Sequence, residues 1–291
     1  SYNNYTFTPV DVTFTIDPKD LENVVLWNKI DEKGVAYTGA PIMLDEGMLG
    51  LTDNDIHEDL IQDTDFTVAY ANNTNVGTAT VTLTGQGNYT GEVSFTFDIV
   101  RNLNITFSDN RQWATYYADE NLQIPEGLKA YIVTNISDNV VTVAEISYIP
   151  QHVGVLLNYE GNIEDFPEAF LAAAYTGATQ DFDSNKLKGT SAETAVSSIT
   201  GGSVYVLYNN EFVKSTTGTI PANRAYLVLD DAVFGGQGVR SLIIVIDEYA
   251  GIAEITVNNM ANGQYYNLQG MRMAQPRKGL VIVNGKKILV K

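Results

Sequence analysis

The chain contains no cysteine among its 291 residues. This absence excludes disulfide bonds, thiolate metal sites and cysteine nucleophiles. Histidine is almost as scarce, because only His57 and His152 are present. A serine–histidine–acid triad needs a histidine within hydrogen-bonding reach of a nucleophile, and the chain has no G-x-S-x-G, H-E-x-x-H, phosphate-binding-loop or EF-hand motif. We therefore expect no catalytic residues and a protein that is not an enzyme.

Long apolar runs are absent too, so we predict no transmembrane segment. The chain also lacks positive charge: its formal net charge is −18 at pH 7, and a surface this acidic repels nucleic acid. We therefore expect no nucleic-acid partner. The C-terminal residues 250–291 are an exception, because they carry one acidic side chain and six basic ones: Arg272, Arg277, Lys278, Lys286, Lys287 and Lys291. A small basic tail thus follows an acidic body.

Apolar residues are plentiful and regularly spaced. They make up 44% of the chain, which is enough for a sizeable core. Over most of the chain, β-branched and aromatic residues alternate with small polar ones, the period-2 pattern of half-buried strands. Residues 165–177 differ, because Pro167, an Ala-rich run and Gly177 follow one another and predict a short helix. The expected fold class is all-β, interrupted by this one helix.

Two stretches in the first hundred residues repeat each other. Val12–Asp17 reads "VTFTID" and Val93–Asp98 reads "VSFTFD". Such a repeat suits small β-sandwich modules in tandem, although Thr-rich strands can also resemble one another by chance. We predict tandem immunoglobulin-like β-sandwich modules followed by a small C-terminal β-hairpin unit. The expected parts are the end of a preceding repeat or a linker (1–9), an Ig-like sandwich (10–100), a second sandwich with the short helix (101–249) and the hairpin unit (250–291).

Three sets of motifs resemble families of exported bacterial proteins. The first module contains "YTGAPI", "DFTVAYANNTNVGTATVTLTGQGNYTG" and "FTFDI", and it resembles the bacterial Ig-like repeats often called MBG-like. The middle module contains "WATYYADENL", "NKLKGT" and "GTIPANRAYLVLD", and it resembles a module found near the C-termini of exported Bacteroidota proteins. The tail contains "YNLQG", "KGL" and "VNGKK", and it resembles type IX sorting domains. These resemblances imply an extracellular or outer-membrane-associated location on a Bacteroidota cell.

The tail also contains a strong hairpin signal. Asn284 and Gly285 lie between "LVIV" and "KKILVK", and both residues tolerate the positive φ that a type I′ turn needs. Two interpretations stay open for this hairpin. It is either a working sorting signal or a cap over an exposed edge of the preceding sandwich, and one hairpin can do both.

Two groups of side chains are candidate ligand-binding residues. The acidic stretch 53–65 offers the bunched oxygen atoms that Ca²⁺ requires, from Asp53, Asp55, Asp59, Asp63 and Asp65. The alternative is a solvated acidic loop that keeps the surface soluble. The candidate aromatic platform consists of Trp113, Tyr116 and Tyr117, whose rings would stack on sugars. The alternative is that these rings belong to the core, and in a strand the two adjacent tyrosines must face opposite sides.

The expected function is adhesion or binding by a segment of a larger cell-surface or secreted protein. The partners expected are host or matrix glycans and glycoproteins, and we expect a monomer with no cofactor other than calcium. Two alternatives stay open: a passive stalk and export module for an upstream domain, and a carbohydrate-binding module. Exposed coplanar aromatic rings would favour the carbohydrate-binding module, whereas a surface without a pocket would favour the stalk.

Overall fold

The computed structural model describes residues 10–45, 47–108, 111–137, 139–161, 167–230 and 240–246, together with short strands of the C-terminal region. These residues form an all-β protein; besides strands, they contain two 3₁₀ turns, η1 (Leu21–Asn23) and η3 (Val196–Ser198), and no α-helix. None of their helical segments is long and apolar enough to cross a membrane. The chain divides into two compact units: unit 1 is Ser1–Asn104 with Pro167–Thr176, and unit 2 is Ile105–Phe166 with Gly177–Lys291.

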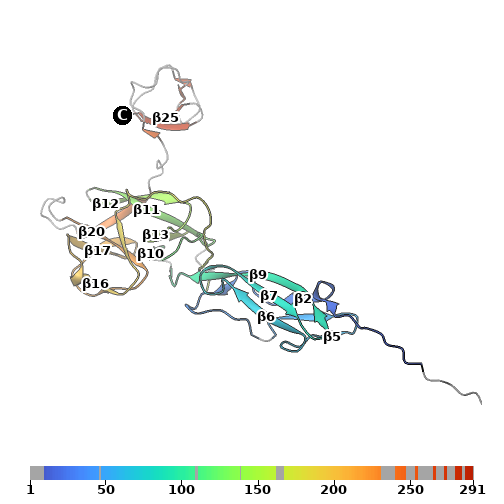
Figure 1. Cartoon of the computed structure of the whole chain (residues 1–291). Helices are drawn as coiled ribbons and strands as arrows, with labels where there is room; N and C mark the ends of the chain where they lie inside the picture. The colour runs from blue at the N-terminus through green and yellow to red at the C-terminus, as the bar shows by residue number, and fades with distance from the viewer. Residues whose placement is uncertain are drawn as a thin grey trace, which may run out of the picture. The chain divides into compact units, whose positions relative to one another are not determined.

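Unit 1 contains a main sheet of order β14-β9-β7-β6, with β3 pairing alongside β9 (Figure 1). A smaller sheet of order β2-β4-β5 and the parallel pair β1-β8 accompany it. Residues from the main sheet and from the β2-β4-β5 sheet pack into one core. The bounds are β1 (Lys19–Asp20), β2 (Val25–Asn28), β3 (Val35–Ala36), β4 (Leu49–Asp53), β5 (Glu58–Asp59), β6 (Phe66–Ala71), β7 (Gly77–Gly85), β8 (Tyr89–Thr90), β9 (Glu92–Asn102) and β14 (Leu171–Ala172).

The period-2 pattern of the sequence explains the central strand of this sheet. On β7, Ala79, Val81 and Leu83 are fully buried, and the threonines between them face the other side. Successive side chains of a strand point to opposite faces, so the Thr/aliphatic alternation places one complete row of apolar groups in the core. The sequence-based expectation of strands in this region is confirmed.

The predicted helix at 165–177 is wrong. The described part of this stretch contains β14, which pairs antiparallel with the end of β9, with Leu171 opposite Asn102. Phe170 and Ala172 are buried, at 4% and 1% exposure. The buried residues are thus two positions apart, as in a strand, and do not follow the 3.6-residue period of a helix. Helix propensity is a weak preference that tertiary contacts override, and here pairing with β9 satisfies backbone hydrogen bonds while Phe170 and Ala172 become buried.

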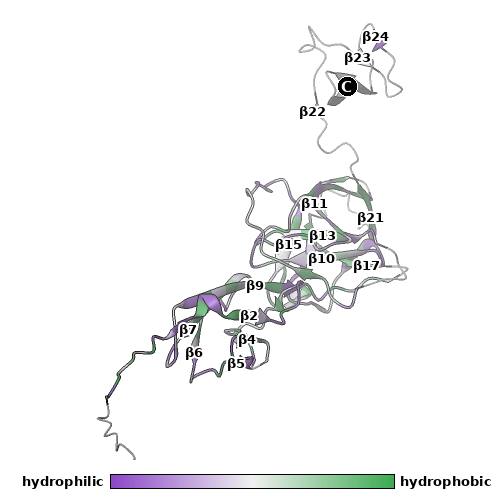
Figure 2. Ribbon diagram, turned by 90° about the vertical axis from the view of Figure 1, so that its right-hand side faces the viewer, coloured by the Kyte–Doolittle hydropathy of each residue, from purple (hydrophilic) through white to green (hydrophobic). Residues whose placement is uncertain are grey.

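The first copy of the sequence repeat has a different environment from the second. Residues 10–18 form no regular secondary structure, and Val10, Val12, Phe14 and Ile16 are each about 80% exposed. Figure 2 shows the alternation of apolar and polar residues along this extended segment. The second copy lies in β9, where Phe97 is 5% exposed and Val93 and Phe95 pack against the core. Residues 1–9, predicted to end a preceding repeat, lie outside the described residues.

Unit 2 is built on one nine-stranded sheet of order β10-β13-β11-β12-β21-β18-β17-β20-β15. The strands are antiparallel except for the parallel pair β12-β21. A separate antiparallel pair joins β16 to β19. The bounds are β10 (Trp113–Tyr117), β11 (Leu128–Ser137), β12 (Val140–Ile146), β13 (Gly154–Tyr159), β15 (Leu187–Thr190), β16 (Thr194–Ala195), β17 (Ser203–Tyr208), β18 (Glu211–Ser215), β19 (Thr219–Ile220), β20 (Arg224–Leu229) and β21 (Ser241–Ile246).

The nine-stranded sheet curls until its two edges meet. The edge strand β10 lies against β20 and the other edge strand, β15. The Tyr117 amide donates a hydrogen bond to the Asn223 carbonyl at 3.2 Å, and the Asn223 side chain donates to the Tyr117 carbonyl at 3.1 Å. The result is a nearly closed, barrel-like sheet (Figure 1). A two-sheet sandwich was expected in this region, whereas the described strands form a single curled sheet and the short β16-β19 pair.

The C-terminal region contains a small sheet of order β22-β26-β25-β23-β24. Val283 of β25 pairs with Lys286 of β26, which is the register required by the two-residue hairpin predicted at Asn284 and Gly285. The turn itself lies outside the described residues. The bounds are β22 (Ala253–Glu254), β23 (Tyr265–Tyr266), β24 (Arg272–Met273), β25 (Gly279–Val283) and β26 (Lys286–Val290).

Candidate functional site

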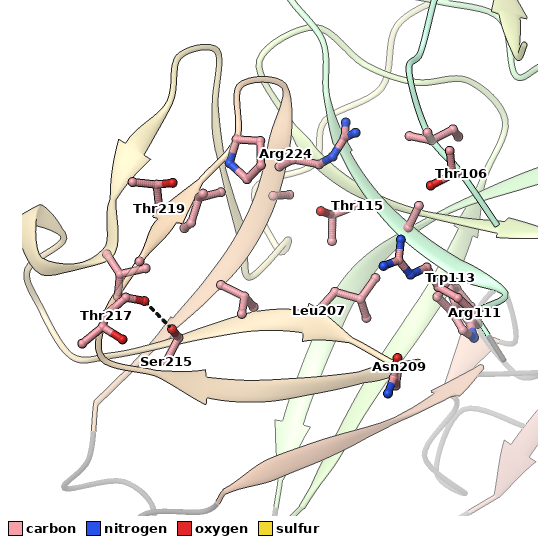
Figure 3. Close-up of a pocket in the computed structure, with 18 residues that line it drawn as sticks. Thr106, Arg111, Trp113, Thr115, Leu207, Asn209, Ser215, Thr217, Thr219 and Arg224 are labelled. Carbon is pink, nitrogen blue, oxygen red and sulfur yellow. Dashed lines mark hydrogen bonds between the residues drawn. The ribbon is translucent and has the colours of Figure 1, made fainter. Parts of the chain in front are cut away.

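Unit 2 contains a pocket of about 350 Å³ (Figure 3). Its polar lining consists of two arginines, Arg111 and Arg224, and of six side chains that carry a hydroxyl or amide group: Thr106, Thr115, Asn209, Ser215, Thr217 and Thr219. Trp113 supplies the one aromatic ring among the described lining residues, and aliphatic side chains such as Leu207 and Ile220 complete the wall. The volume lies at the lower end of the range of small-molecule sites, about 300–1,000 Å³.

One wall comes from β10 and the residue pair before it. Arg111, Trp113 and Thr115 are two residues apart along an extended chain, so their side chains point to the same face, and all three line the pocket. The start of this wall is held by Asn210, whose side-chain oxygen accepts hydrogen bonds from the amides of Gln112 at 2.8 Å and Trp113 at 3.1 Å. Asn210 thereby positions the tryptophan.

The β17–β18 hairpin brings Asn210 to this position. Tyr208 pairs with Glu211, so Asn209 and Asn210 form a two-residue turn, with φ of 46° and 66°. Positive φ at both central residues is the type I′ requirement, and asparagine tolerates it better than most residues. The turn therefore places Asn209 in the pocket wall and aims Asn210 at β10.

The opposite wall follows the connection from β18 through β19. Ser215 donates a hydrogen bond from its hydroxyl to the Thr217 carbonyl at 3.0 Å, drawn as the dashed line in Figure 3. Gly218 has a φ of 90°, and its carbonyl accepts a hydrogen bond from the Val196 amide at 3.0 Å. These contacts fix a tight turn whose hydroxyl-bearing side chains face Trp113 and Arg111 across the pocket in Figure 3.

The described wall of the pocket carries two basic side chains, although the protein as a whole is acidic. Burial lowers the pKa of the Arg224 guanidinium, Tyr116 partly opposes this effect, and the positive charge of Arg111 lowers the pKa of Arg224 further. No Asp or Glu occurs among the described residues that line the pocket. The described part of the pocket wall therefore carries two guanidinium groups, and Arg224 also donates a hydrogen bond to the Asn223 carbonyl at 3.1 Å.

The predicted aromatic platform is not assembled. Trp113 is half-buried, with its ring centroid 5.2 Å from that of Tyr131, and it contributes to the pocket. Tyr116 is 2% exposed and part of the core, on the strand face opposite Thr115, which is the alternative that the sequence left open. Tyr117 is half-buried, and its ring stacks with that of His152 at 6.1 Å. Of the three predicted residues, only Trp113 lines the cavity.

The predicted calcium ligands do not gather in one place either. No group of three or more His, Asp or Glu side chains in the described part of the chain is arranged to hold a metal ion. Asp53 is buried at 3% exposure, and Lys19 bridges it to Asp55 with contacts of 2.5 and 2.7 Å. Tyr89 donates a further hydrogen bond to Asp53 at 3.1 Å. The ammonium group of Lys19 lowers the pKa of the Asp53 carboxyl and takes the place that a cation would need.

The other three aspartates of the acidic stretch serve local structure. Asp59 accepts a hydrogen bond from the Thr52 hydroxyl at 2.5 Å, and Asp65 accepts one from the Ile61 amide at 2.9 Å. Asp63 occupies a turn position with a φ of 65°, which aspartate adopts more readily than most residues. Their spacing in the sequence thus reflects turn formation rather than a shared ligand.

Sequence reasoning missed the two arginines. Arg111 precedes "WATYYADENL" and Arg224 lies within "GTIPANRAYLVLD", and no motif marks either as a binding residue. The alternation of Arg111, Trp113 and Thr115 on one strand face was the available signal for one wall. Arg224 lies in the same pocket as this wall only because the sheet curls, so no local sequence pattern could predict that the two are close together.

The fold and the site thus define an all-β protein with a pocket lined by a tryptophan and two arginines in a nearly closed sheet. No protein-family model matches the chain, and comparisons with curated proteins and with solved structures found no significant match.

Proposed function

We propose that this chain is a non-enzymatic binding segment of an exported cell-surface protein, and that it recognises glycans through the pocket of unit 2. The observation that carries the proposal is the composition of the pocket: one half-buried tryptophan faces side chains that carry hydroxyl and amide groups. A sugar presents both an apolar ring face and a rim of hydroxyl groups. Such a ligand can pack against Trp113 and exchange hydrogen bonds with the threonines and Asn209.

The rigidity of the walls supports the same proposal. The backbone of Trp113 is held by Asn210 through two hydrogen bonds, and the turn at Gly218 is held through its carbonyl. Walls that are fixed before the ligand arrives lower the entropic cost of binding. A passive stalk has no need for such a pre-formed cavity.

The cell-surface setting rests on the resemblance of the three modules to exported Bacteroidota proteins. For unit 1 we propose an immunoglobulin-like sandwich, supported by two sheets that share one core. For unit 2 we propose a flattened sandwich whose faces belong to one curled sheet, supported by core residues from strands on both sides. The apolar row Val12, Phe14 and Ile16 supports the assignment of the N-terminal segment to a tandem repeat.

Binding of the purified chain to a glycan array tests this function. We expect reproducible binding that is lost in Trp113→Ala. The control is Trp27→Ala, which removes the second of the two tryptophans and lies in unit 1, and this variant should retain binding. Circular dichroism and the melting temperature show whether each variant is folded. Arrays that stay blank for the folded wild-type chain would contradict the proposal and favour the stalk and export module.

A further inference from the structure

The N-terminal segment of unit 1 carries an apolar row that no sheet covers. Val10, Val12, Phe14 and Ile16 are each about 80% exposed, and they alternate with polar residues along an extended stretch (Figure 2). In the described part of the chain, no backbone hydrogen bond joins residues 10–18 to another segment. Exposed apolar surfaces of this kind mark contact sites. The spacing of the row is that of a strand, so the matching partner is a sheet.

The second copy of the sequence repeat shows which sheet such a segment fits. Val12–Asp17 and Val93–Asp98 share four of their six residues, and both differences keep the polar or apolar character of the position. The second copy belongs to β9, which pairs antiparallel with β7. Val12, Phe14 and Ile16 stand at the positions of the three apolar residues of β9 that pack on the core of unit 1, namely Val93 opposite Leu83, Phe95 opposite Val81 and Phe97 opposite Ala79.

The polar positions of the two copies match as well. Asp98 accepts a hydrogen bond from the Thr78 hydroxyl of β7 at 2.7 Å, and Asp17 stands at the same position of the first copy. When a strand is added to the edge of a sheet, its main-chain hydrogen bonds supply affinity and its alternate side chains supply specificity. Residues 12–17 therefore carry the side-chain pattern that pairing with a β7-like strand requires.

We infer that Val12–Asp17 is a donor strand that binds a second immunoglobulin-like module, by pairing antiparallel with that module's β7-like strand in the register of Val93–Asp98. The partner is defined by its chemistry: it presents an open sheet edge on which threonine alternates with aliphatic residues. In unit 1 this edge is already covered by β9, so two intact copies of the chain do not bind each other in this way. The inference rests on the tandem-repeat assignment proposed above and does not involve the pocket of unit 2.

The test uses two forms of the full chain, one as the acceptor and one as the donor. The acceptor carries Phe97→Ala, which removes a buried ring from β9 and so loosens this strand on β7, and Phe14→Asp, which disables its own donor segment. The donor carries Thr15→Cys and the acceptor Thr80→Cys, because Thr15 corresponds to Thr96, which pairs with Thr80. Opposite residues of antiparallel strands have Cα atoms about 4.5–5.5 Å apart, which a disulfide can join. The native chain contains no cysteine, so each mixed dimer formed under mild oxidation and identified by its mass reports one residue pair.

Matched controls define the register and the donor. Thr84→Cys in place of Thr80→Cys moves the acceptor thiol about 13 Å along the same face of β7, beyond the roughly 7 Å that a disulfide spans, so we expect the mixed dimer to be lost. A donor with Phe14→Asp should also lose it. A donor with Met43→Asp, which adds the same charge at another exposed apolar residue of unit 1, should retain it. An acceptor with an intact Phe97 should link little, because β9 then stays on β7.

Circular dichroism and the melting temperature show whether each form is folded, and Phe97→Leu replaces Phe97→Ala if that acceptor is unfolded. Mixed dimers that depend on Phe14 and on Thr80→Cys would support the inference. The absence of mixed dimers with a folded acceptor, equal linking through Thr80→Cys and Thr84→Cys, or equal linking by the Phe14→Asp donor would overturn it. Each of these results leaves glycan recognition standing, because that function is read from binding of the wild-type chain to the array.

Discussion

Asn185 joins three strands of unit 2 through a single side-chain amide. Its oxygen accepts hydrogen bonds from the amides of Val133 at 3.0 Å and Leu187 at 3.1 Å, and its nitrogen donates to the Gly154 carbonyl at 2.7 Å. The β11–β12 register shifts between Val133 and Asn135, so this bulge directs the Val133 amide toward Asn185. Val133 is fully buried, which leaves its amide little access to water.

The substitution Asn185→Ala therefore removes three hydrogen bonds at once. At about 1 kcal/mol for each bond, the expected loss in the free energy of unfolding of unit 2 is about 3 kcal/mol. With a urea dependence of about 2 kcal/mol/M, the unfolding midpoint should fall by about 1.5 M. Asn185→Asp keeps both acceptor bonds but places a carboxylate oxygen against the Gly154 carbonyl, which repels it, so we expect this variant to be destabilised too.

The assay is urea unfolding followed by tryptophan fluorescence. The chain has two tryptophans, Trp27 in unit 1 and Trp113 in unit 2, so a Trp27→Phe background reports unit 2 alone. Lys186→Ala is the matched control, because Lys186 is the exposed neighbour of Asn185. A midpoint for Asn185→Ala within about 0.25 M of the Lys186→Ala midpoint, with the same slope, would refute the reasoning.

Three further predictions concern other contacts. Lys19 lowers the pKa of the Asp53 carboxyl in the folded state. The ion pair therefore stabilises unit 1 above about pH 4, and this stabilisation is lost as the pH falls through the folded-state pKa of Asp53. Asp53→Asn should make the free energy of unfolding depend less on pH in the acid range, and an unchanged pH dependence would argue against the ion pair. Gly189→Ala places a methyl group against the Tyr117 ring and should destabilise unit 2 by about 1–3 kcal/mol in urea unfolding. In a Tyr117→Ala background, which removes the ring, the same Gly189→Ala substitution should destabilise unit 2 by less. The double substitution Ser94→Thr with Phe97→Ile writes "VTFTID" into β9. If the two repeat copies are equivalent, it should lower the free energy of unfolding of unit 1 by less than about 2 kcal/mol, while the control Phe97→Asp should unfold unit 1. A double variant as unstable as the control would disprove the equivalence.

Local patterns predicted the strands but not every element. The alternation around Val81 correctly indicated a half-buried strand, and the position of Asn284 and Gly285 agrees with the observed register of β25 and β26. The Ala-rich stretch near Ala172 was read as a helix, because helix propensity is a property of short segments. Its pairing with β9 depends on residues about seventy positions earlier, which no window of that length contains.

The sequence by itself determined the all-β class, the acidic character and the absence of thiol chemistry, because composition and period-2 alternation are local properties. Only the tertiary structure decided which residues meet. Lys19 pairs with Asp53, and the described acidic side chains form no group of three that is arranged to hold a metal ion. The curl of the nine-stranded sheet brings β20 against β10, and this non-local closure places Arg224 in the same pocket as Arg111 and Trp113.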